Sequence, residues 1–153
     1  HWAFTGSLLP FRLDISSLWG RIESITFQAR TVPHFAAEDL LIILCAHGAK
    51  HAWDGTLRTL CDLAELTLCA RPLNWDRIEA CVDASQCWRM VTLALVLACE
   101  LLNANVPERF LRKANEDIVL KSLLPRALKG LFRDSGEPMN PFPFYVSLMC
   151  PHR

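Results

Sequence analysis

The chain has 153 residues, a length that suits one domain with a single core. Apolar residues make up 52% of the sequence and charged residues 21%, with only six Gly, which excludes a disordered or collagen-like chain. Sixteen basic and sixteen acidic side chains cancel, which excludes the electrostatic footprint of a protein that mainly binds nucleic acid or an anionic membrane. Any anion site must therefore be local.

The first 35 residues mix strand and turn signals. Residues 25–35 alternate apolar and polar side chains around a polar middle, which predicts a short hairpin or a pair of edge strands. Pro33 argues against a central position in a sheet. Residues 1–4 suggest the end of another strand, and residues 14–21 are compatible with one or two helical turns.

From Ala36 onward the apolar residues follow the period of helices. The expected helices span residues 36–52, 57–69, 74–84, 86–102, 107–113 and 116–132, with the third capped by Asn74 and the last bent or interrupted at Pro125. The helix at 86–102 is apolar on nearly every side and should be the central one. The sequence thus predicts a mainly α fold, a bundle of five to six helices with a small N-terminal β element.

This pattern divides the chain into a β or irregular segment at 1–35, a helical domain at 36–133 and a tail at 134–153. The tail holds four of the nine prolines and reads as an extended arm. Its aromatic residues Phe142, Phe144 and Tyr145 are expected to dock on another surface.

The cysteines indicate a cytoplasmic protein. There are seven, with no CxxC spacing, and most occupy apolar helix positions, so we expect all of them to be reduced. No signal peptide is visible, and the nearly uncharged run from Met90 to Cys99 is about half of what a membrane-spanning helix needs.

One run of residues, 47–54 (HGAKHAWD), carries candidate chemistry. On a helix, positions 47, 50, 51 and 54 fall within about 100° of one another, so two imidazoles, an ammonium and a carboxylate share one stripe. Leu40 and Ile43 continue the same stripe toward the start of the helix, so its face could form the wall of a cleft. Gly48 would let another backbone or a ligand approach closely.

Three interpretations of His47, Lys50 and His51 are open. They could be a helix end whose charges suit the dipole, or an anion site, because Lys and His at a helix end suit phosphate oxygens. A metal site through His47 and His51 is the third, but a zincin would have Glu in place of Gly48, and no third ligand follows at a recognisable spacing. Asp62 is a further candidate, for which a solvated ion pair with Arg58 is the simpler explanation.

Several segments together resemble a known family. They are AEDLLIILCAHGAKHAW at residues 37–53, Leu57, Leu60, CDLAEL at 61–66 and LNWD at 73–76, with the opening HWAF similar to the strand that follows the family's last acidic residue. Over about residues 1–105 the chain resembles the bacterial uncharacterised nucleotidyltransferase family, of the polymerase-β-type superfamily.

The resemblance implies transfer of a nucleotidyl group from a nucleoside triphosphate to an acceptor, with Mg²⁺ held by the carboxylates of an Asp-x-Asp pair that follows a Gly-Ser turn. The sequence has no Gly-Ser turn that is followed by an Asp-x-Asp pair. We therefore expect the C-terminal helical part of such a protein, inactive by itself and without a metal of its own, whose residues 1–35 end a catalytic-type domain. The resemblance favours nucleotide binding by His47, Lys50 and His51.

An alternative is a helical protein-interaction or scaffolding module with no catalytic role. A Gly-Ser turn with Asp-x-Asp upstream of His1 would favour the enzyme, and an unrelated upstream domain would favour the module. If the chain is the C-terminal part of a longer nucleotidyltransferase, its N-terminal strands have lost neighbours, so self-association through that edge is expected.

Overall fold

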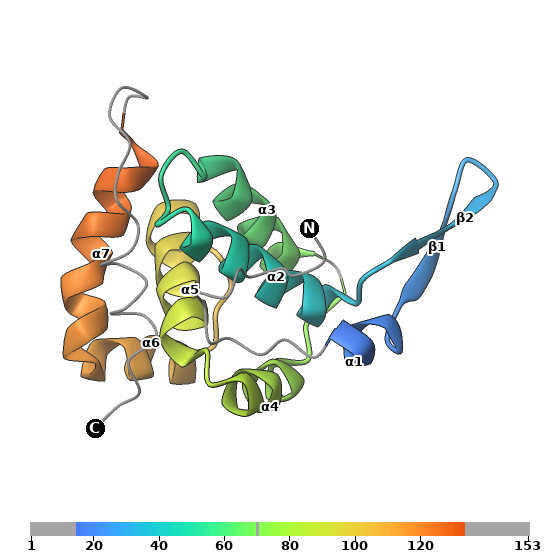
Figure 1. Ribbon diagram of the computed structural model, residues 1–153. Coiled ribbons are helices and arrows are strands. Elements are labelled where there is room, and N and C mark those ends of the chain that lie inside the picture. The colour runs from blue at the N-terminus through green and yellow to red at the C-terminus, as the bar shows by residue number, and fades with distance from the viewer. Residues whose placement is uncertain (1–14, 70, 134–153) are drawn as a thin grey trace.

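The computed structural model describes residues 15–69 and 71–133 of the chain (Figure 1). In this part, seven helices and one two-stranded hairpin confirm the mainly α prediction. The elements are α1 (Ile15–Trp19), β1 (Glu23–Phe27), β2 (Arg30–His34), α2 (Ala37–Lys50), α3 (Leu57–Leu68), α4 (Trp75–Ser85), α5 (Trp88–Leu102), α6 (Glu108–Glu116) and α7 (Ile118–Leu131). The expected strand at 1–4 and the tail at 134–153, including Phe142, Phe144, Tyr145 and Cys150, lie outside the described residues.

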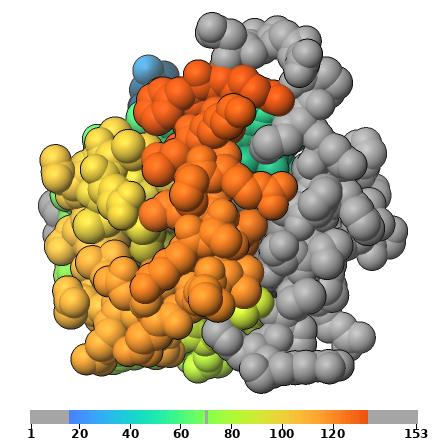
Figure 2. Space-filling view, turned by 90° about the vertical axis from the view of Figure 1, so that its left-hand side faces the viewer, coloured from blue at the N-terminus to red at the C-terminus, as the bar shows by residue number. Residues whose placement is uncertain are grey.

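Helix α5 is the centre of the bundle, as its apolar composition predicts. It packs against α2, α3, α4, α6 and α7, and most of its side chains are buried. Figure 1 shows α5 between α7 on one side and α2 and α3 on the other, and Figure 2 shows α7 (orange) lying across the outer face of the molecule. Burial on all sides explains why α5 tolerates so few charges.

Helix ends follow local chemistry. The side chain of Asn74 accepts a hydrogen bond from the Arg77 backbone N–H at 3.0 Å, which confirms the expected cap of α4. The boundary between the last two helices differs from the prediction: α6 continues to Glu116, and Asp117 alone separates it from α7. Asp117 has extended backbone angles and caps α7 by accepting from Val119 and Leu120.

Pro125 does not interrupt α7, which runs from Ile118 to Leu131. The missing N–H leaves the carbonyl of Lys121, four residues earlier, without its helical partner. Both Pro125 and Lys121 are exposed, so water can bond that carbonyl, and the expected interruption was wrong. None of the helices in the described segments is long and apolar enough to cross a membrane.

The hairpin pairs β1 with β2 in antiparallel register, with Ile25 opposite Val32 and Phe27 opposite Arg30. The two residues between the strands, Gln28 and Ala29, both have positive φ, as in the type I′ turns that suit the twist of short hairpins. The hairpin extends away from the helices (Figure 1). The hairpin expected around residues 25–35 is therefore present, slightly earlier in the chain.

Candidate functional site

Helix α2 carries two groups of polar side chains, one at each of its ends. Its first turn holds Glu38 and Asp39, and its last turn holds Lys50, followed by the C-cap His51. Between them Leu41, Ile42 and Cys45 are buried in the core, so packing fixes the helix along its length. The two polar groups therefore have fixed positions at opposite ends of one helix.

The cationic stripe, defined as His47, Lys50 and His51, lies on the molecular surface. All three side chains are exposed, and the two imidazole rings lie 4.8 Å apart between centroids. Partial burial lowers the pKa of His51, and the nearby His47 and Lys50 lower it further, while Asp54 opposes the shift. An anion bound between these side chains would relieve that repulsion.

Gly48 makes room for a side chain of the same chain and not for a ligand. After α2 the backbone turns through Ala52 and Trp53, which both have positive φ, and the Trp53 N–H donates to the Gly48 carbonyl at 2.9 Å. A Cβ at position 48 would lie 2.4 Å from ring carbons of the fully buried Trp53. The expectation that Gly48 admits a ligand is wrong, because the indole ring already fills the space.

Asp54 does not share the stripe. It follows the turn after α2, and its carboxylate forms an ion pair with Arg133, just beyond α7. The chain at Gly55 also touches α7, where the Gly55 N–H donates to the Gly130 carbonyl. The stripe thus keeps its two imidazoles and its ammonium, and the carboxylate is used to join the end of α2 to α7.

The hairpin and the stripe are at opposite ends of α2. His34 of β2 is close to the first turn, while His47 comes ten residues after the start of the helix, a separation of about 15 Å at the usual helical rise. Leu40 and Ile43, on the same face, are only half-buried. The stripe therefore faces outward from the helical body and not toward the described strands.

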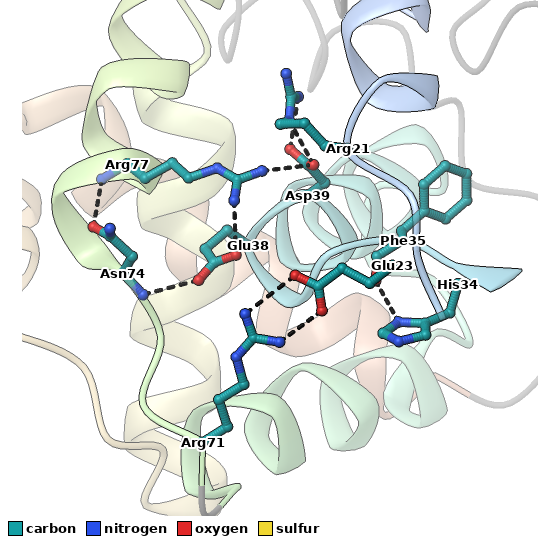
Figure 3. Close-up of polar contacts among 9 residues, drawn as sticks. All are labelled: Arg21, Glu23, His34, Phe35, Glu38, Asp39, Arg71, Asn74 and Arg77. Carbon is teal, nitrogen blue, oxygen red and sulfur yellow. Dashed lines mark hydrogen bonds and ion pairs between the residues drawn. The ribbon is translucent and has the colours of Figure 1, made fainter. Parts of the chain in front are cut away.

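The first turn of α2 is the centre of a buried ionic network (Figure 3). Glu38 and Asp39 are only 4% and 3% exposed. The Arg21 guanidinium donates twice to Asp39, both at 2.9 Å, and Arg77 of α4 donates to Asp39 at 3.0 Å and to Glu38 at 3.4 Å. The Asn74 backbone N–H donates to Glu38 at 3.0 Å. These contacts join α2, α4 and the segment between α1 and the hairpin.

A second ion pair attaches the hairpin itself. Arg71, before α4, donates to both carboxylate oxygens of Glu23 in β1, at 2.6 and 3.1 Å. The hydrogen bonds from Arg71 lower the pKa of Glu23. Because the pair is exposed to solvent, it positions the base of the hairpin more than it stabilises the fold.

Sequence reasoning missed this network. The sequence shows Glu38 and Asp39 only as acidic residues at a helix start, where the dipole favours them. Their partners Arg21 and Arg77 are 18 and 38 residues from Asp39, so no local spacing reveals the pairs. The one available signal is that both carboxylates stand directly before a strongly apolar run.

The remaining sequence candidates do not add to a site. Asp62 and Arg58 are both exposed, and no ion pair joins them, so the expected pair is wrong.

A cavity of about 300 Å³ lies between α5, α6 and α7. Residues such as Trp88, Thr92 and Lys113 line it, and none of the residues of the cationic stripe does.

The described residues do not fit a magnesium ion. Mg²⁺ prefers carboxylate oxygens that are free to bind it. Glu38 and Asp39 are occupied by guanidinium and amide donors, and Asp54 by Arg133. In residues 15–69 and 71–133, no group of three or more His, Cys, Asp or Glu side chains could hold a metal ion. The metal interpretation of His47 and His51 therefore has no third ligand in this part of the chain.

These features define a helical domain with an N-terminal hairpin and a cationic helix end. A family model described as "uncharacterised nucleotidyltransferase" matches residues 1–103, which is more than half of the chain. The chain therefore belongs to the uncharacterised nucleotidyltransferase family. The match ends at the C-cap of α5, Asn103, so α6 and α7 lie beyond it. No curated protein and no solved structure matches the chain.

Proposed function

We propose that the chain is the C-terminal helical part of a nucleotidyltransferase, which transfers a nucleotidyl group from a nucleoside triphosphate to an acceptor. Membership of the nucleotidyltransferase family supports the reaction class. The helical body supports the assignment to a non-catalytic part, because its buried carboxylates hold the fold together. In this proposal residues 1–35 end the catalytic-type domain and residues 36–133 form the helical domain.

We expect this chain alone to transfer no nucleotide from any triphosphate in the presence of Mg²⁺ or Mn²⁺. Its sequence has no Asp-x-Asp pair after a Gly-Ser turn, and its described carboxylates are engaged or scattered. The measurement is release of pyrophosphate and labelling of acceptors by the purified chain. Turnover that disappears when a residue of this chain is mutated would contradict the proposal.

The cationic stripe is proposed as the contact of the helical part with the triphosphate. The observation that carries this proposal is that His47, Lys50 and His51 are exposed together on one face, with Asp54 turned to Arg133. Lys50 supplies a positive charge, and the two imidazoles can donate hydrogen bonds to phosphate oxygens. Packing of Trp53 on Gly48 fixes the turn that follows, so the stripe is held in place before a ligand arrives.

Lys50→Ala is expected to weaken triphosphate binding by the complete protein by about 1–3 kcal/mol, roughly 5- to 150-fold in Kd, the scale for losing one charged hydrogen-bond partner. Its effect on stability should be smaller, since a lysine at a helix end contributes about 0.3–1 kcal/mol through the dipole. The measurement is calorimetric titration with ATP and GTP, together with the melting temperature.

The matched control is Lys129→Ala, which removes an exposed lysine from the last turn of α7. This substitution removes an interaction with the helix dipole similar to that of Lys50, but it should leave the affinity for nucleotide unchanged. Equal affinity of the Lys50→Ala variant and the wild type would mean that the stripe only serves the helix dipole. The interaction-module alternative would then be the better account of the chain.

We also propose a cytoplasmic location. Six cysteines fall in the described segments, and all six are free: Cys45, Cys61, Cys69, Cys81, Cys87 and Cys99. Burial raises the pKa of Cys87 to about 12 and raises that of Cys45 well above its usual value, so these two thiols stay protonated and unreactive. Such thiols serve as small apolar side chains and suit a reducing compartment.

A further inference from the structure

The hairpin is the least covered element of the described fold. Ile25 and Phe27 of β1 are 50% and 61% exposed, and Val32 of β2 is 40% exposed. Ile25 and Phe27 are two positions apart on one strand and Val32 is directly opposite Ile25, so all three lie on one face. A two-stranded hairpin is at best marginally stable in water without further packing, and this one is joined to the helical body only at its base, so an added strand would stabilise it.

The register determines which backbone groups point out of the hairpin. A two-residue turn is closed by hydrogen bonding between its flanking residues, Phe27 and Arg30, and bonded and non-bonded pairs then alternate along the strands. The pairs Thr26–Thr31 and Ser24–Pro33 are therefore non-bonded. Their N–H and C=O groups point away from the hairpin, those of Ser24 and Thr26 along one edge and those of Thr31 and Pro33 along the other.

The two edges differ in how they are protected. Pro33 has no N–H, so the outer edge of β2 keeps only the Thr31 donor, and the charged Arg30 stands at the start of this strand. Proline and charge are common devices that prevent further strand pairing. The outer edge of β1 has neither device from Ser24 to Phe27, and the donors and acceptors of Ser24 and Thr26 are intact. Only the β1 edge can thus form a full set of hydrogen bonds with another strand.

We propose that two copies of this chain pair through their β1 edges, antiparallel about a twofold axis at Ile25. In this arrangement Ser24 faces Thr26 of the second copy, and the two pairs satisfy every outward group of both residues. Ile25 faces Ile25 of the second copy at a non-bonded position, where side chains are closest.

The resulting four-stranded sheet joins the apolar faces of both hairpins into one surface. The uncharged edge and the net charge of zero add no long-range repulsion between copies. The proposal also gives a definite site to the self-association that the sequence predicts. It is independent of nucleotide binding, so its test needs no nucleotide.

The test is the monomer–dimer equilibrium of the chain by sedimentation velocity over a range of concentrations. Thr26→Pro removes the outward donor of β1 but no hydrogen bond between β1 and β2, and because it acts twice in a symmetric dimer it should raise the dimer Kd by about tenfold or more. Thr31→Pro is the matched control, because it removes the equivalent donor from the opposite edge. It should leave the dimer unchanged.

A second pair of variants distinguishes the loss of the dimer contact from misfolding of the hairpin. Ile25→Lys places like charges opposite each other at the twofold axis and should abolish the dimer, whereas Val32→Lys, on the outer strand of the four-stranded sheet, should weaken it much less. Circular dichroism should show an unchanged helical body in all four variants. A monomeric wild type, or a dimer that Thr26→Pro and Ile25→Lys do not affect, would overturn the proposal and assign the β1 edge to a different strand.

Discussion

Replacing Asp117 by Ala is expected to lower the free energy of unfolding by about 3–5 kcal/mol, the cost of leaving one member of a buried ion pair without the other. Asp117 and Arg89 have side chains only 4% and 8% exposed, and the Arg89 Nε donates to Asp117 at 2.7 Å. The second carboxylate oxygen caps α7 through Val119 and Leu120, so the substitution also removes a cap worth about 1 kcal/mol. Denaturant unfolding measures the loss.

Asp117→Asn is the control, because its side-chain oxygen can still cap α7 while the charge opposite Arg89 is lost. The free energy of unfolding of the Asn variant should lie between that of the wild type and that of the Ala variant. Equal stability of the Asn variant and the wild type would show that the cap, and not the ion pair, explains the contribution of Asp117. Unchanged stability of the Ala variant would contradict both explanations.

The environment of Asp117 predicts how the free energy of unfolding depends on pH. Burial by itself raises the pKa of Asp117, but the hydrogen bonds from Arg89, Leu120 and Val119 outweigh it and leave the pKa below its usual value. A carboxyl group whose pKa is lower in the folded state stabilises the fold fully above its unfolded pKa, and that contribution is lost as the pH falls through the folded pKa. Acid titration of the unfolding free energy should therefore be less steep in Asp117→Asn.

Replacing Arg77 by Met is expected to cost about 3 kcal/mol, because it leaves Glu38 and Asp39 buried with fewer cationic partners. The estimate is at the lower end of the usual range because Arg77 is 34% exposed and Arg21 still binds Asp39. Met keeps most of the apolar stem, so the variant tests the guanidinium and not the packing. Thermal and denaturant unfolding measure the effect.

Arg109→Met provides the matched control on a solvent-exposed pair. Arg109 of α6 binds Asp76, which is 89% exposed, and Glu79, which is 29% exposed. Because Arg109 itself is 38% exposed, removing these surface contacts should cost about 1 kcal/mol or less. Adding Glu38→Gln to Arg77→Met should recover part of the larger loss, because one of the two buried charges is then absent. A cost for Arg77→Met no greater than that for Arg109→Met would show that the network is not an energetic centre of the fold.

The cationic stripe was foreseeable from the sequence, because His47, Lys50 and His51 are local neighbours on one helix and their spacing alone places them on one face. The role of Gly48 was not foreseeable in the same way. It depends on Trp53 folding back through two residues with positive φ, a conformation that neither Ala52 nor Trp53 signals. Likewise, the partner of Asp54 is Arg133, which is 79 residues later in the sequence.

The sequence by itself determined the helices, the central place of α5, the cap at Asn74 and the presence of the hairpin. Those features depend on side-chain periodicity and on contacts within one turn, which the order of residues states directly. The tertiary structure alone decided which charges are buried, as for Asp39 with Arg21 and Arg77, and for Asp117 with Arg89. Those pairs form between segments far apart in the chain, and the free energy of burying a charge depends on which partner the packing of the helices brings to it.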